Sequence, residues 1–227
     1  MLTYNLNKIK KTIVSLALCV VSTIATANAS DDFFTAARND DESTMVKLLL
    51  RGFDLNTRDA AGNHALSVAI REGSMKVADF LLKQPSLQVE ARNVQGESPL
   101  MMAALNGQLA LARRLIERKA EVNKTGWTPL HYAATSATPV SASMVRLLLE
   151  HHAYIDAESP NRSTPLMMAA QYGLPAVVRL LLEEGADPTL RNEQGLTAID
   201  FARQASRPDA VALIAASVRA RSPSGTW

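Results

Sequence analysis

The hexapeptide TPLHYA, Thr128–Ala133, has the features of a helix start. A threonine hydroxyl suits the N-cap, and proline suits the first helical position because the N–H that it lacks has no intrahelical partner there. Similar segments occur before and after it, as SPLMMA in Ser98–Ala103 and TPLMMA in Thr164–Ala169. Three helices are therefore predicted to begin in the same way at nearly regular intervals.

Apolar residues repeat at that interval along most of the chain. Five of them close apolar clusters near the end of a helical pattern, at spacings of 33, 34, 33 and 33 residues: Leu49, Leu82, Ile116, Leu149 and Leu182. A second series marks the start of another helix: Leu66, Leu100, Leu130, Leu166 and Ile199. Glycines at 73, 107 and 173 are expected to end the first helix of each pair and to permit a tight turn. The period predicts stacked helix pairs, with Leu149 buried between neighbouring pairs.

The repeat resembles the ankyrin family, whose T-P-L-H-x-A signature is matched in full by Thr128–Ala133. The resemblance extends from about Asp31 to Ser217. It implies an all-α repeat solenoid, an ankyrin stack of about six helix-turn-helix units with β-hairpin loops. It also implies that His131 bridges loops through hydrogen bonds, as the histidine of the family signature does.

Five segments are expected along the chain. They are a cleaved secretory signal peptide at 1–29, an N-terminal capping unit at 30–59, four central repeats at 60–192, a C-terminal capping unit at 193–221 and a flexible tail at 222–227. Altered terminal units are expected because each has only one neighbour and exposes its other face to water.

The N-terminal segment indicates export. Residues 8–11 hold three lysines, Ile13–Ile24 is apolar, and Ala27–Ala29 forms a small-x-small cleavage site before Ser30. The apolar run is shorter than the roughly 20 residues that a membrane-spanning helix needs. We therefore expect a periplasmic or secreted protein with no membrane insertion after cleavage. The alternative is a bacterial lipoprotein modified at Cys19, the only cysteine.

The charge balance argues against a nucleic-acid or anionic-membrane ligand. The chain has 24 basic and 22 acidic residues, and removal of the three signal lysines leaves 21 basic residues against the same 22 acidic ones. Such a near-neutral protein lacks the positive surface that those ligands require. The sequence contains no common catalytic or nucleotide-binding motif, and the histidines lack acidic neighbours at metal-ligand spacing. No catalytic residue, cofactor or metal is predicted.

One repeat departs from the others while keeping its length. Ile116 and Thr128 are 12 residues apart, whereas Leu149 and Thr164 are 15 apart, so the hairpin at residues 117–127, the short finger, has lost three residues. The turn at residues 135–143, the long turn, has gained three. Family geometry implies that both line the concave side. They either mark a recognition site or reflect drift in tolerant loops.

Trp127 in the short finger is the principal candidate for partner contact, because no other repeat has an aromatic residue at this position. The alternative is that its ring folds over the gap in its own hairpin. The same register places further candidates on the concave side: Arg71, Glu72, Glu97, Leu105, Asn106, Lys124, Gln171 and Tyr172.

The sequence thus predicts a non-catalytic scaffold whose concave groove binds one periplasmic or secreted protein, and which is a monomer when free. A narrower version is an inhibitor, immunity or supporting protein for an exported enzyme. The alternative from a different class is an enzyme or metal carrier, for which the methionines at 101, 102, 167 and 168 and His131 are the candidates. Those methionines are expected instead to fill the core.

Overall fold

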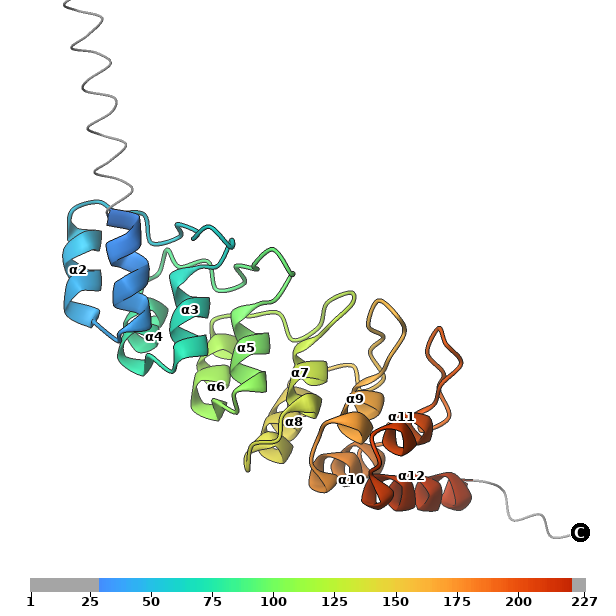
Figure 1. Cartoon of the computed structure of the whole chain (residues 1–227). Helices are drawn as coiled ribbons and strands as arrows, with labels where there is room; N and C mark the ends of the chain where they lie inside the picture. The colour runs from blue at the N-terminus through green and yellow to red at the C-terminus, as the bar shows by residue number, and fades with distance from the viewer. Residues whose placement is uncertain (1–28, 222–227) are drawn as a thin grey trace, which may run out of the picture. The chain divides into compact units, whose positions relative to one another are not determined.

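The computed structural model describes residues 29–221 as pairs of helices joined by loops (Figure 1). The predicted tail and the signal peptide, including Cys19 but not Ala29, lie outside these residues. The chain divides into two compact units, Met1–Leu87 and Gln88–Trp227, called unit 1 and unit 2.

Unit 1 contains two helix pairs in its described part. The first pair comprises the helical residues 29–38 and α2, Glu42–Leu50. The second comprises α3, Ala65–Glu72, and α4, Met75–Leu82. Phe33 is fully buried, and its ring lies 4.7 Å from that of Phe53 between centroids. The predicted capping unit therefore has an aromatic core of its own.

Unit 2 contains four helix pairs up to residue 221. Their bounds are α5 Pro99–Leu105, α6 Leu109–Glu117, α7 Pro129–Thr135, α8 Ser141–Glu150, α9 Pro165–Gln171, α10 Pro175–Glu183, α11 Ala198–Gln204 and α12 Pro208–Arg221. The first helices α5, α7, α9 and α11 contact one another in order, and the second helices form a parallel series behind them. The predicted helix-pair repeat is confirmed.

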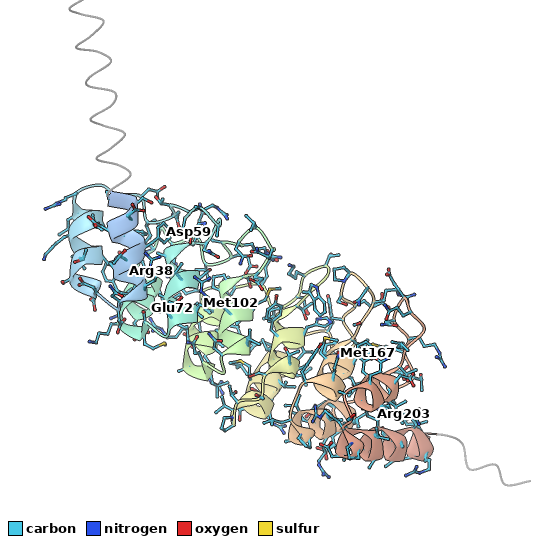
Figure 2. All side chains as sticks on the ribbon, viewed as in Figure 1. Arg38, Asp59, Glu72, Met102, Met167 and Arg203 are labelled. Atoms are coloured by element: carbon cyan, nitrogen blue, oxygen red, sulfur yellow. The ribbon has the colours of Figure 1, made fainter. Side chains whose placement is uncertain are left out.

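The first helices begin as predicted, with a reciprocal hydrogen bond at each start. The Ser98 and Thr164 hydroxyls accept from the backbone N–H of Met101 and Met167. In return, the thioether of Met167 accepts the N–H of Thr164 at 3.4 Å, and Met101 does the same at Ser98. Both methionines are 1% exposed, and Met167 can be located on α9 in Figure 2. They are core and capping residues, as expected.

The register predicted for the second helices is wrong by one residue. Leu149 is only half-buried, whereas Leu148 is 0% exposed. The same holds for Leu115 and Leu181, which are fully buried beside the half-buried Ile116 and Leu182. Adjacent helical residues point about 100° apart, so the contacts with α6 and α10 select one leucine of each cluster.

The predicted hairpin loops are present, but residues 29–221 contain no extended strand and one isolated bridge, between Arg58 and His64. Four loops are closed by a backbone N–H that donates to the carbonyl four residues ahead, at 2.9–3.1 Å. These pairs are Asp59 to Asn63, Asn93 to Glu97, Ser159 to Ser163 and Asn192 to Leu196.

Polar side chains connect successive loops of unit 2. Glu90, Asn123 and Asp156 stand 33 residues apart, and each accepts a backbone N–H from the following loop at 2.8–3.1 Å. The donors are Glu121, Tyr154 and Asp187. This series fixes the spacing of loops that have no sheet to connect them.

Two backbone positions carry special constraints. Arg162 adopts φ +60°, as predicted for a site where the family has glycine. Gly173 has no positive φ; a Cβ atom there would clash with the carbonyl oxygen of Ala134 in α7. The predicted turn at Gly173 therefore depends on close packing between helix pairs.

Candidate functional site

Trp127 lies at the end of the short finger, directly before α7. Its side chain is 37% exposed, and its ring meets that of His131 edge-on, with centroids 5.2 Å apart and an angle of 79°. Part of the indole therefore packs within its own repeat while the rest faces solvent. Both alternatives raised by the sequence contribute to this arrangement.

The exposed part of Trp127 forms one wall of a pocket of about 250 Å³ in unit 2, called the aromatic pocket. Three successive repeats build it. The lining residues are Leu105 at the end of α5, Trp127, then His131, Tyr132 and Thr135 of α7, and Met168 with Tyr172 of the α9 region. Leu105, Trp127 and Tyr172 are 38%, 37% and 56% exposed, so three large apolar side chains face water at one place.

His131 supports the pocket from below. Its Nδ1 accepts the N–H of Thr128 at 3.2 Å, so the ring proton resides on Nε2, which donates to the carbonyl of Ser163 at 2.9 Å. Burial lowers the pKa of His131 from 6.5 to about 4, although the bond to Ser163 opposes that shift. The ring is neutral near pH 7 and bridges two loops, which confirms its predicted structural role.

Tyr132 connects the pocket to a carboxylate. Its hydroxyl donates to Oε1 of Glu97 at 2.8 Å, and Asn93 donates to Oε2 at 2.7 Å. Burial, followed by Glu97, raises the pKa of Tyr132. The phenol therefore stays protonated and acts as a donor, which holds the Glu97 carboxylate at the outer end of its ring.

Lys124 stabilises the short finger. Its ammonium group donates to the carbonyl of Gly96 in the preceding loop at 2.9 Å. Burial, and then the nearby Arg92, lowers the pKa of Lys124. The residue that the sequence placed among the partner contacts thus has a structural bond in this protein.

The long turn does not form a second lip of the pocket, contrary to the implied concave position. Only Thr135 at its start lines the pocket. The Ser136 hydroxyl donates to the carbonyl of Leu105 at 2.8 Å, and Thr138 lies so close to Gly107 that a Cβ there would be 2.5 Å from its Oγ1. The turn packs on its neighbour.

The other predicted contacts are scattered. Asn106 and Gln171 follow or end the helices that carry Leu105 and Tyr172, but neither lines the pocket. Arg71 and Glu72 end α3 in unit 1, where they form an exposed pair at 3.2 Å. Sequence reasoning missed Tyr132, Thr135 and Met168 as walls; their spacing on the first helices was the available signal.

Residues 29–221 contain no cluster of three or more histidine, cysteine, aspartate or glutamate residues able to hold a metal ion. In the same part of the chain, no helix has both the length and the apolar character to cross a membrane.

Models of ankyrin repeats match two overlapping ranges, residues 33–125 and 85–159, and a further ankyrin-repeat model matches residues 148–202. Among curated proteins, the chain is 32% identical over 182 residues to the tyrosine-protein kinase Shark of Drosophila melanogaster, covering 78% of this chain and 19% of the kinase. It is 33% identical over 155 residues to the nuclear factor NF-kappa-B p105 subunit of Gallus gallus, covering 66% and 16%. The chain thus spans about a fifth or less of these relatives.

Two solved structures have similar folds. An ankyrin repeat domain from Acinetobacter baumannii has a TM-score of 0.68 and 26% identity, with 82% of this chain and 97% of that chain covered. A chain in the complex of a predatory endopeptidase from Bdellovibrio bacteriovorus with an immunity protein has a TM-score of 0.70, 28% identity and the same coverage. The family models together match well over half of the sequence, and the chain belongs to the ankyrin-repeat family.

Proposed function

We propose that this protein is a non-catalytic scaffold that binds one periplasmic or secreted protein through the aromatic pocket. The carrying observation is the exposure of Leu105, Trp127 and Tyr172 around one hollow. Apolar side chains clustered at a surface are characteristic of interaction sites, and tryptophan and tyrosine are enriched among the residues that dominate binding energy.

The family supports this proposal at a coarse level, since ankyrin repeats mediate protein–protein binding and are generally not catalytic. The pocket's own histidine is consistent with it: both nitrogens of His131 are used in bonds that hold the fold. A repeat fold does not identify the partner, so the pocket has to carry the argument.

A narrower form of the proposal makes the partner an exported enzyme and this chain its inhibitor or immunity protein. Two observations favour it. The N-terminal segment has the lysine-led apolar pattern of a secretory signal, and one similar structure is a complex between an endopeptidase and an immunity protein.

The test uses the chain from Ser30 as bait in an extract of exported proteins from the source organism, with captured proteins identified by mass spectrometry. Trp127→Ala is compared with Tyr154→Ala, which removes an equally large aromatic side chain that is 68% exposed and outside the pocket. The captured protein is then purified, and its binding and enzymatic activity are measured with each variant.

Trp127→Ala is expected to weaken binding at least tenfold, or about 1.4 kcal/mol, whereas Tyr154→Ala leaves binding unchanged. Because Trp127 also contacts His131, a loss of stability of about 1 kcal/mol accompanies the substitution. Equal binding by both variants would refute the pocket as the site. A captured protein whose activity is unaffected by saturating scaffold would refute the inhibitor version alone.

A further inference from the structure

The carboxylate beside the aromatic pocket lacks a cationic partner. Glu97 is held by two neutral donors, Tyr132 and Asn93, and forms no ion pair within residues 29–221. Other loop glutamates of unit 2 are paired: Glu90 with Arg92 at 2.6 Å, and Glu158 with Arg162 at 2.9 Å. Glu97 is therefore an oriented negative group without a counter-charge.

The pocket walls also favour a positive charge. Trp127, Tyr132 and Tyr172 supply aromatic rings, whose faces attract cations. His131 adds no competing charge, because its buried ring is neutral. Lys124, the cation on the same finger, is bonded to the Gly96 carbonyl.

The size and the apolar walls limit the occupant. Small-molecule pockets usually measure about 300–1,000 Å³, so a hollow of about 250 Å³ suits one side chain of a larger ligand. Leu105 and Met168 offer apolar contacts of the kind that the methylene stem of a long basic side chain makes.

We propose that the aromatic pocket receives an arginine or lysine side chain of the protein partner. The stem packs against Leu105 and Met168, and the charged head lies over the aromatic rings and pairs with Glu97. This inference rests on the proposed function, since it specifies the chemistry of the segment that the scaffold binds.

The test requires no knowledge of the partner. Trp227→Phe leaves Trp127 as the only tryptophan of the two in the chain, so its fluorescence reports on the pocket. The probes are N-acetylated, C-amidated tripeptides with arginine, lysine, norleucine or glutamate between two glycines. Norleucine is the matched control, because it keeps the length and apolar character of lysine without its charge. Chemical-shift changes in a labelled sample confirm the location.

The arginine and lysine peptides are expected to bind saturably and about tenfold or more tightly than the norleucine peptide, and added salt should weaken them. Glu97→Gln should remove that preference while the far-UV spectrum stays native. Glu158→Gln, which alters a paired glutamate, should preserve it.

Equal or tighter binding of the norleucine peptide, preference for the glutamate peptide, or no saturable response to any peptide would overturn the proposal. A preference retained in Glu97→Gln would also overturn it. Because these outcomes do not depend on the bait experiment, a failure here together with partner loss in Trp127→Ala would leave the scaffold function standing.

Discussion

Acidification from about pH 7 to about pH 4.5 is expected to destabilise the protein through His131. The folded chain buries this imidazole, which is 1% exposed, and lowers its pKa from 6.5 to about 4. The unfolded chain takes up the proton near pH 6.5, so below that pH the unfolded state binds more protons than the folded one. The stabilising effect of the neutral ring is therefore complete above pH 6.5 and is lost as the pH falls towards 4.

The magnitude follows from the width of that window. One proton changes the free energy of unfolding by at most about 1.4 kcal/mol per pH unit, so the loss from this group reaches about 3 kcal/mol near pH 4. At about pH 4.5 it is about 2–3 kcal/mol, a large share of the stability of an ordinary domain.

The assay compares urea unfolding of the wild type and His131→Gln at both pH values. Glutamine keeps an N–H donor for the Ser163 carbonyl but does not titrate, so the variant is less stable at neutral pH and the gap narrows by about 2–3 kcal/mol on acidification. Subtraction cancels His64, whose pKa burial also lowers. His151→Gln, at an exposed position, controls for the loss of an imidazole. A gap that stays constant would refute the neutral, buried ring.

Three further outcomes are expected. Leu148→Ala should cost about 2–5 kcal/mol in a denaturant melt, because its side chain is fully buried, whereas Leu149→Ala should cost clearly less; equal losses would restore the register predicted from sequence. Lys119→Gly should raise the free energy of unfolding by about 1 kcal/mol, because Lys119 has φ +68° and an exposed side chain; a decrease would show that the backbone there is unstrained. N-terminal sequencing of exported protein should begin at Ser30; a retained Met1 or a lipid on Cys19 would overturn the export proposal.

The candidate site was predictable in part, because exposure at a loop or helix end follows from the repeat register. Leu105, Trp127 and Tyr172 were identified in this way, and all three line the pocket. The roles of Lys124 and Glu97 were not accessible in the same way, since they depend on atoms in other repeats. Lys124 bonds the carbonyl of Gly96, 28 residues away, and Glu97 accepts from Tyr132, 35 residues away.

Local chemistry in the sequence determined the helix starts, the period and the family. A hydroxyl followed by proline sets a helix N-terminus through contacts within one turn, and a 33-residue repeat of such starts permits one kind of stack. Tertiary structure decided which leucine of each cluster is buried, whether Gly173 serves a turn or a close contact, and how far the pKa of His131 falls. These properties depend on how one helix pair rests against the next, because burial and electrostatic environment are set by atoms that lie a whole repeat away along the chain.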